Sequence, residues 1–183
     1  MCSSGRLVKV NYILPKSKAN GPGTRFTIWV QGCSIHCPGC SNMDTWDPAG
    51  GQEISVGDII KQVEAIEGLD GITITGGEPI DQYEAVYELC SKLFGKISIF
   101  LTTGYELRQL GYLKALKILD VLDMVCAGPF DKSLLCRDQW RGSSNQNIFY
   151  LTDCGRNQSS MPVISKEVHI DEAGNALITG FTK

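Results

Sequence analysis

Three closely spaced cysteines are the residues of this chain whose types and spacing most clearly indicate chemistry. Cys33, Cys37 and Cys40 follow the pattern C-x3-C-x2-C, and no fourth cysteine lies near them. A structural zinc site normally takes four protein ligands and is closed. Three thiolates on a cuboidal 4Fe–4S cluster instead leave one of its irons free to bind another molecule. The triplet therefore predicts a metal centre with an open position.

The cysteines allow two other interpretations. A disulfide framework needs an oxidising compartment, and residues 1–9 carry neither the apolar core nor the cleavage site of a signal peptide. No run approaches the roughly 18 apolar residues of a membrane span, so we expect a cytoplasmic protein with reduced thiols and no membrane contact. A zinc site with a remote fourth ligand stays open, and the candidates for that ligand are Cys126, Cys136, Cys154, His36 and His169.

The remaining five cysteines, Cys2, Cys90, Cys126, Cys136 and Cys154, share no ligand spacing among themselves. Cys90 falls on the apolar face of a predicted helix, and Cys126 falls in an apolar predicted strand. A free cysteine in such a place packs as a small hydrophobic side chain. We expect both residues to be structural.

Length predicts one globular domain over residues 1–183, in which the family resemblance given below implies a core at 20–151 and a C-terminal extension at 163–183. The chain has 43% hydrophobic and 20% charged residues, which is ordinary for a globular protein, and a formal net charge of −3. No basic stripe stands out, so charge gives no support to nucleic-acid binding.

The elements that must position the cysteines alternate between strand and helix. Strands are expected at 26–31, 71–75, 97–102, 121–126 and 147–151. Helices are expected from 55, from 81 and over 106–119, and polar loops at 16–23 and 155–161. A hairpin is expected from strands 167–170 and 176–181 around a turn at 171–175. Alternation of strands and helices predicts an α/β fold with a parallel sheet, and a closed eight-fold barrel needs about 250 residues. We therefore expect a partial (β/α) barrel or an open parallel sheet, with a C-terminal β-hairpin.

Four unusual segments each follow one of the predicted parallel strands. They are the cysteine loop, Gly76–Pro79, Thr102–Tyr105 and Ala127–Phe130. Ligands of open parallel sheets bind at the carboxyl ends of the strands. The sequence therefore predicts that all four segments meet at one edge of the sheet.

Several residues in or beside these segments have both a functional and a structural interpretation. Gly76 and Gly77 leave the backbone bare for close approach to a ligand, or form a tight turn into a helix that begins near Pro79. The hydroxyls of Thr102 and Thr103 face a ligand or cap a helix. Asp123 interrupts an apolar run, so it lies at an edge or is a paired polar group that faces a site.

Taken together, these segments resemble the radical S-adenosylmethionine superfamily. Within it they are most similar to the glycyl-radical-enzyme activases, the branch that includes the activases of anaerobic ribonucleoside-triphosphate reductase. The resemblance covers about residues 20–150, and its segments are Gly21–Arg25, Gln31–Cys40, Asn42, Thr45–Trp46, Gly76–Pro79, Thr103–Tyr105, Asp123, Gly128–Phe130 and Gly142–Gln146. Two positions depart from the activase pattern: Ser41 replaces an aromatic residue and Ala127 replaces an aspartate. These departures leave the substrate open.

The resemblance implies a set of site residues. Three thiolates would bind a 4Fe–4S cluster, and these are Cys33, Cys37 and Cys40. The fourth iron would bind the amino and carboxylate groups of S-adenosylmethionine. The methionyl end would lie against Gly76, Gly77 and Glu78, and the adenosine near Gly39 and Ser41. Contacts to the ribose or the amino group would come from Thr102, Thr103 and Asp123.

The resemblance also implies a reaction and partners. S-adenosylmethionine would be cleaved reductively to methionine and a 5′-deoxyadenosyl radical, which would take a hydrogen atom from a glycine of a partner glycyl radical enzyme resembling ribonucleotide reductase. A reduced flavodoxin or ferredoxin-type protein would supply the electron. Two alternatives stay open. One is a radical enzyme that acts on a small molecule or peptide, similar to the small deazapurine synthases. The other is a non-catalytic Fe–S or zinc protein.

Overall fold

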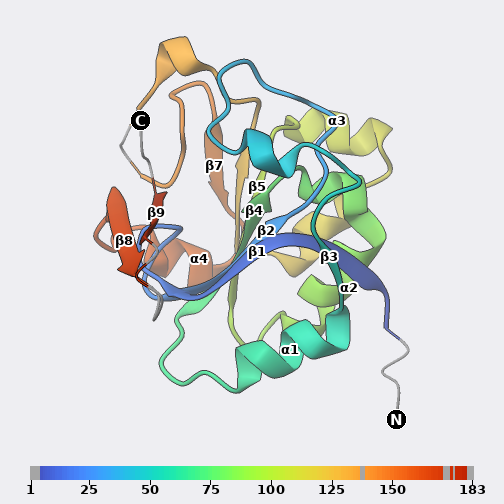
Figure 1. The fold of residues 1–183 in the computed structure, drawn as a ribbon, viewed down its shortest axis with the longest axis vertical. Helices are drawn as coiled ribbons and strands as arrows, with labels where there is room; N and C mark the ends of the chain where they lie inside the picture. The colour runs from blue at the N-terminus through green and yellow to red at the C-terminus, as the bar shows by residue number, and fades with distance from the viewer. Residues whose placement is uncertain (1–4, 137–138, 171–173, 175, 181–183) are drawn as a thin grey trace.

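The computed structural model describes residues 5–136, 139–170, 174 and 176–180 (Figure 1). Its main sheet has seven strands in the order β3-β1-β2-β4-β5-β6-β7, and a second sheet pairs β8 with β9. The strands of the main sheet are β1 (Leu7–Ser17), β2 (Arg25–Val30), β3 (Gln52–Ser55), β4 (Gly71–Gly76), β5 (Ser98–Thr103), β6 (Met124–Ala127) and β7 (Asn147–Tyr150). The second sheet contains β8 (Lys166–Ile170) and β9 (Ala176–Gly180).

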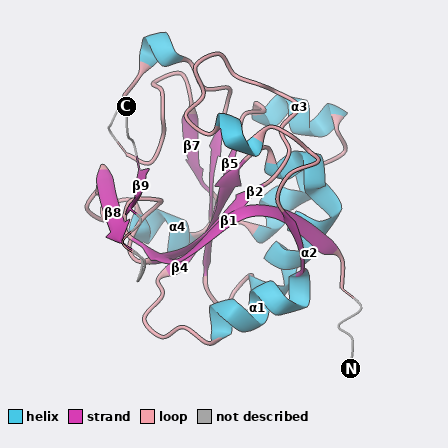
Figure 2. Cartoon of the chain, in the orientation of Figure 1, coloured by secondary structure: helices cyan, strands magenta, loops and turns pink. Residues whose placement is uncertain are grey.

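Four α-helices and four short 3-10 helices connect these strands in the described part of the chain. The α-helices are α1 (Val56–Glu64), α2 (Tyr83–Leu93), α3 (Leu107–Tyr112) and α4 (Asp153–Gln158). The 3-10 helices are η1 (Met43–Thr45), η2 (Pro79–Gln82), η3 (Leu116–Val121) and η4 (Lys132–Leu134). Helices α1, α2 and α3 lie on one side of the main sheet, and the hairpin β8–β9 lies on the other side, beside the end of β1 (Figure 2).

The centre of the main sheet is parallel. Strands β2, β4, β5 and β6 run in the same direction, whereas β1 pairs antiparallel with β2 and β3 at one edge and β7 pairs antiparallel with β6 at the other. The carboxyl ends of the parallel strands are in register, since Val30 lies beside Gly76 and Thr103 beside Ala127. The α/β class, the partial barrel with a parallel sheet and the C-terminal hairpin are confirmed.

The core lies between the sheet and helices α1 to α3. Strand side chains such as Ile28, Ile74 and Leu101 are fully buried against this layer. The apolar face predicted for the second helix is confirmed, because all of its members are buried in α2: Ala85, Val86, Leu89, Cys90 and Leu93. The first helix begins where it was expected, after Ser55, whose side chain caps it by accepting a hydrogen bond from the Asp58 N–H at 3.1 Å.

Three expectations about the elements are wrong. Strands β1 and β3 were not expected, and β1 extends to Ser17 into a stretch expected to be a loop. The helix expected over 106–119 is divided into α3 and η3, because Lys114 takes a left-handed backbone with φ of 56°. Part of the loop expected at 155–161 is helix α4, whose first turn is capped by Thr152.

The hairpin is attached to the end of β1. Glu167 of β8 accepts a hydrogen bond from the Ser17 hydroxyl at 2.7 Å, and Asn20 donates to the Thr179 hydroxyl of β9 at 2.9 Å. The expected turn at 171–175 lies outside the described residues except for Gly174. Among the helices that the structure describes, none has the length and apolar character to span a membrane.

Candidate metal centre

The cysteine loop begins directly after β2, and its two ends are closed by backbone hydrogen bonds. Gly32 N–H donates to Thr45 C=O at 2.7 Å, and Cys33 N–H donates to Trp46 C=O at 3.2 Å. The buried Gln31 side chain adds a bond from its amide nitrogen to the Asp47 C=O at 2.7 Å. The three cysteines therefore lie on a loop whose base is held by the protein backbone.

The three thiols are free, partly exposed and within electrostatic range of one another. Burial raises the pKa of Cys33 and Cys37, and the neighbouring Cys40 and Cys33 thiols add to the effect at Cys37. Backbone N–H groups near Cys33 (Ile35 and His36) and near Cys37 (Phe130) oppose the effect of burial on these pKa values, and the Asn42 N–H donates to Cys40 Sγ at 3.4 Å. Soft thiolates that accept N–H hydrogen bonds are the usual ligands of Fe–S clusters, so this donor set fits a cluster.

No group of three or more His, Cys, Asp or Glu side chains converges on a single-ion site within the described ranges. Each cysteine ligand of a cuboidal cluster binds a different iron, so the ligands of a cluster need not converge on one point.

Two residues with positive φ shape the turn between Cys33 and Cys40. His36 has φ of 51° and Gly39 has φ of 76°. The His36 ring stacks on Trp46 with centroids 4.6 Å apart, which places Trp46 against this loop. A Cβ atom at Gly39 would lie 2.7 Å from Lys132 Cδ, so a larger residue would displace the Lys132 side chain. Ser41 is exposed next to Cys40.

The Gly76-Gly77 turn packs backbone to backbone against the start of the cysteine loop. A Cβ atom at Gly77 would lie 2.1 Å from the Gly32 carbonyl oxygen, and one at Gly76 would lie 2.6 Å from Trp29 Cα. Gly77 N–H donates to Val30 C=O and Glu78 N–H donates to Gly32 C=O, both at 2.8 Å. The two glycines therefore permit the close approach of two protein segments at the carboxyl edge of the sheet.

The Glu78 carboxylate connects this turn to the end of β5. Its oxygens accept hydrogen bonds from the Thr103 hydroxyl at 2.7 Å, the Gly104 N–H at 2.8 Å and the Ile80 N–H at 2.9 Å. The side chain is 1% exposed, and burial raises its pKa from 4.5 to about 7 in spite of these three donors. Thr102 is not part of this network, because its hydroxyl donates to Thr75 on the neighbouring strand at 2.7 Å.

Asp123 is the one predicted cofactor contact that the structure does not bring to this edge. Strand β6 begins at Met124, so Asp123 lies at the amino edge, at the opposite end of the parallel strands. Its carboxylate accepts hydrogen bonds from the Ile99 N–H at 2.9 Å and from the Thr152 hydroxyl. The contact of Asp123 with the cofactor was expected from the resemblance alone, and the predicted strand 121–126 already placed this residue nearer its amino end.

Arg25, which ends the segment Gly21–Arg25, also lies at the amino edge. Its guanidinium is fully buried and donates to the Thr73 hydroxyl at 2.8 Å and to the Ser98 C=O at 3.0 Å, among other acceptors. Burial lowers its pKa to about 9, and the carboxylate of Asp123 opposes that shift. This segment of the resemblance therefore positions the sheet and does not reach the cysteines.

The sequence did not indicate a role for Asp81 and Ser34, two residues at the carboxyl edge. Asp81 accepts hydrogen bonds from the Ser34 N–H at 2.7 Å and the Ser34 hydroxyl at 2.9 Å, and the Tyr105 hydroxyl lies 2.9 Å from Ser34 Oγ. These side chains connect the cysteine loop to the segments after β4 and β5. Asp81 was considered only as the start of a helix, and no spacing in the sequence signals its contact with Ser34.

Comparisons with known proteins agree with this geometry. The model of the family "4Fe-4S single cluster domain" matches residues 19–149. The anaerobic ribonucleoside-triphosphate reductase-activating protein of Enterobacteria phage T4 is 33% identical over 153 residues, which cover 79% of this chain and 96% of that protein. The protein of the same name from Escherichia coli (strain K12) is 34% identical over 155 residues, covering 75% and 95%.

Two more distant similarities cover smaller parts of the chain. The pyruvate formate-lyase 1-activating enzyme of Escherichia coli (strain K12) is 41% identical over 81 residues, which are 40% of this chain and 33% of that enzyme. The crystal structure of QueE from Escherichia coli aligns with a TM-score of 0.41 and 18% identity over 54% of this chain and 53% of the other.

The fold and the three-cysteine loop define a radical S-adenosylmethionine enzyme, and the similar proteins confirm that class together with its two cofactors, a 4Fe–4S cluster and S-adenosylmethionine. Within the class, the chain belongs to the family of anaerobic ribonucleoside-triphosphate reductase-activating proteins, which it matches over nearly their whole length.

Proposed function

We propose that this chain activates a glycyl radical enzyme resembling anaerobic ribonucleotide reductase. When bound, the two cofactors supply one-electron cleavage of S-adenosylmethionine to methionine and a 5′-deoxyadenosyl radical, which takes one hydrogen atom from the target glycine and becomes 5′-deoxyadenosine. The names of the relatives that match most of the chain support this partner. A reduced flavodoxin or ferredoxin-type protein in the cytoplasm is the proposed electron donor.

The observation that carries the proposal is the cysteine loop itself. Cys33, Cys37 and Cys40 are free and partly exposed on a loop whose base is fixed by backbone hydrogen bonds. In the proposed function each thiolate holds one iron, and the fourth iron stays open because the loop offers no fourth cysteine. The protein's part is to hold these ligands, orient the cofactor and exclude water.

The hydrogen bonds that residues at the carboxyl edge already make decide which of their groups we propose as cofactor contacts. The Glu78 carboxylate is buried with three donors, so its role is to join the ends of β4 and β5. The main chain of Gly76, Gly77 and Glu78 is therefore the proposed contact for the methionyl end. The other proposed contacts are Gly39, Ser41, Thr102 and Thr103, and Asp123 is left out because it lies at the opposite edge.

The test is anaerobic reconstitution of the full chain with iron and sulfide, followed by reduction and electron paramagnetic resonance with and without S-adenosylmethionine. We expect a reduced-cluster signal that changes when S-adenosylmethionine is added, and formation of 5′-deoxyadenosine. Mixing with an anaerobic ribonucleotide reductase should then give a glycyl radical signal on that partner. A cluster that does not respond to S-adenosylmethionine would contradict the proposal.

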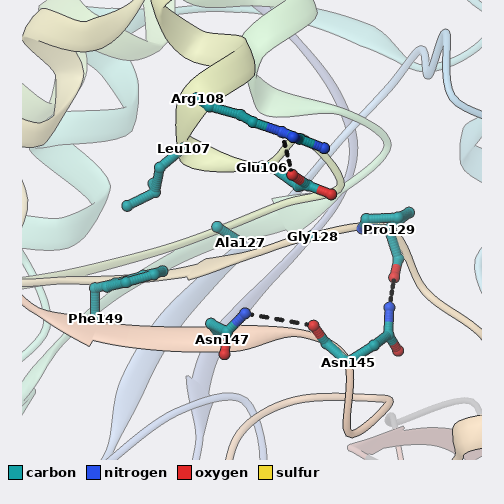
Figure 3. A pocket seen from close by; sticks show the side chains of 9 residues that line it. All are labelled: Glu106, Leu107, Arg108, Ala127, Gly128, Pro129, Asn145, Asn147 and Phe149. Atoms are coloured by element: carbon teal, nitrogen blue, oxygen red, sulfur yellow. Dashed lines mark hydrogen bonds and ion pairs between the residues drawn. The ribbon is translucent and has the colours of Figure 1, made fainter.

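A second outcome would favour a different substrate. Ser41 and Ala127 depart from the activase pattern, and Ala127 lines a pocket of about 380 Å³ between α3 and the ends of β6 and β7 (Figure 3). Formation of 5′-deoxyadenosine with turnover of a small molecule or peptide, and no glycyl radical on the reductase, would retain the radical chemistry and replace the partner.

A further inference from the structure

Ser34, the residue that follows the first cysteine of the loop, is held by two side chains from other segments. Asp81 of η2 accepts the Ser34 N–H at 2.7 Å with one carboxylate oxygen and the Ser34 hydroxyl at 2.9 Å with the other. The Tyr105 hydroxyl, after β5, lies 2.9 Å from Ser34 Oγ and 3.3 Å from Asp81 Oδ1. A serine hydroxyl has one hydrogen to donate, which goes to Asp81, so Tyr105 is the donor to Ser34 Oγ. We call these three side chains, Ser34, Asp81 and Tyr105, the Ser34 anchor.

The two partners in this anchor start from backbone that Glu78 fixes. Asp81 N–H donates to the Glu78 C=O at 3.1 Å, and Gly104 N–H donates to the Glu78 carboxylate at 2.8 Å. Tyr105 N–H donates at 3.1 Å to the Thr103 hydroxyl, which itself donates to the Glu78 carboxylate at 2.7 Å. Both anchoring side chains are therefore fixed relative to the turn that contains Glu78.

The next residue of the loop packs on the same segments. A Cβ atom at Gly104 would lie 2.7 Å from Ile35 Cδ1, so the Ile35 side chain lies directly against the Gly104 backbone. Ser34 and Asp81 are exposed, in contrast to the buried core of the sheet. A substitution at Asp81 therefore releases the loop without leaving a cavity in the core.

The anchor and the closed base restrict the cysteine loop in different ways. The backbone hydrogen bonds of Gly32 and Cys33 to Thr45 and Trp46 join the loop to itself. The Ser34 anchor instead sets where the Cys33 end of the loop lies relative to the turn after β4.

In the proposed function one cofactor contacts both the cluster that the loop holds and the main chain of Gly76, Gly77 and Glu78. Its affinity then depends on how the loop is placed relative to this turn. Changing residues that orient metal ligands without binding the metal typically costs 10–100-fold in metal affinity or activity. We propose that Asp81 is a positioning residue, which holds the Cys33 end of the loop against the turn and thereby raises the affinity for S-adenosylmethionine. This inference rests on the proposed function.

The test compares variants of the full chain after anaerobic reconstitution with iron and sulfide. Asp81→Ala removes both acceptors of Ser34, whereas Asp81→Asn keeps the shape and one side-chain oxygen for the Ser34 N–H. Asp120→Ala is the matched control, an exposed aspartate of the 3-10 helix η3. Iron content is measured first, and calorimetric titration of the unreduced protein, which does not cleave S-adenosylmethionine, then gives its Kd.

We expect Asp81→Ala to keep the iron content of the wild type while its Kd for S-adenosylmethionine rises about tenfold. Asp81→Asn should raise the Kd by less, and Asp120→Ala should match the wild type. An unchanged Kd in iron-loaded Asp81→Ala would overturn the inference. An equal rise in Asp81→Asn and Asp81→Ala would also overturn it, because the lost charge and not the released loop would then explain the effect.

If Asp81→Ala loses iron, Tyr105→Phe decides alone, since it removes a single hydroxyl from the anchor. A raised Kd in Tyr105→Phe would support the inference, and a Kd equal to that of the wild type would overturn it.

A wild-type cluster that does not bind S-adenosylmethionine would contradict the proposed function, and the anchor can be tested separately from it. Amide hydrogen exchange of residues 34–36 in the cluster-free protein measures how firmly this end of the loop is held. Faster exchange in Asp81→Ala than in Asp120→Ala would support the anchor. Equal exchange in the two variants would overturn it.

Discussion

Arg25 at the amino edge of the parallel sheet and the three cysteines at its carboxyl edge differ in burial and in hydrogen bonding. At the amino edge, Arg25 is fully buried and makes five hydrogen bonds, to the side chains of Thr73 and Gln158 and to the carbonyls of Pro22, Ile72 and Ser98. A guanidinium has five N–H donors, so none is left over. At the carboxyl edge, the Cys33, Cys37 and Cys40 thiols stay partly exposed.

The difference separates residues that stabilise the sheet from residues that are available for chemistry. A buried charge is tolerated only when its partners satisfy it, and this is the situation of Arg25. A ligand must keep some of its binding capacity for the molecule it binds, and the thiols do so. The comparison predicts that changes at the amino edge affect folding, whereas changes at the carboxyl edge affect the cluster.

The largest effect is expected from Cys37→Ala, because removing one of three thiolate ligands leaves a cluster without a full attachment. Iron and sulfide per chain after reconstitution should fall far below the wild-type content. Cys90→Ala is the matched control, since Cys90 is buried in α2 and should leave iron binding intact. Equal loss of iron in both variants would contradict the assignment of the ligands.

The next effect is expected at the amino edge. Arg25→Leu leaves the carbonyls of Ile72 and Ser98 without this donor and removes the positive charge near the Asp123 carboxylate, and should lower the free energy of unfolding by about 3–5 kcal/mol. Arg108→Leu is the control, because Arg108 is an exposed residue paired with Glu106 and should cost less than about 1 kcal/mol. Urea denaturation of the cluster-free protein measures both. Similar losses of unfolding free energy in the two variants would contradict the prediction that changes at the amino edge affect folding.

A smaller effect is expected from Glu78, which belongs to the carboxyl edge and yet is buried. Its pKa is raised from 4.5 to about 7, so the folded protein binds more protons at Glu78 than the unfolded protein between these pH values. Stability from this group is therefore present at low pH and is lost as the pH rises through about 7.

Glu78→Gln tests this sign, because the variant cannot titrate. From pH 5 to pH 8 the wild type should lose up to about 3 kcal/mol more of its unfolding free energy than the variant. Denaturation at the two pH values gives the difference. If the unfolding free energies of the two proteins changed equally with pH, burial would not be the dominant influence on the pKa of Glu78.

The parallel strands and the cysteine loop were predictable because their signals are local. Strands β4 and β5 are runs rich in β-branched residues, and the cysteine spacing is contained in eight residues. Strand β1 contains Pro15 and lysines, and its position depends on pairing with β2 and β3. That pairing is non-local, so no pattern within the strand indicates it.

The other differences between the predicted and the observed site also depend on contacts that are not local in the sequence. Asp123 lies just before β6, and it was expected at the site only because the resemblance implied it. The contact between Asp81 and Ser34 joins residues far apart in the chain through a fold that the sequence does not display. Helix α4 has no apolar periodicity, and it is positioned by Gly155, where a Cβ atom would lie 2.3 Å from the Asp123 carbonyl oxygen.

The closed base of the cysteine loop has a consequence for how a cluster is acquired. Gly32 and Cys33 join the start of the loop to Thr45 and Trp46 at its end through backbone hydrogen bonds that involve no thiol. The entropy of bringing those ends together is therefore lost when the sheet folds, and none of it remains to be lost when the metal binds. We therefore expect the chain to stay folded when a cluster is lost to oxidation, so that a new cluster can be inserted without synthesis of a new protein.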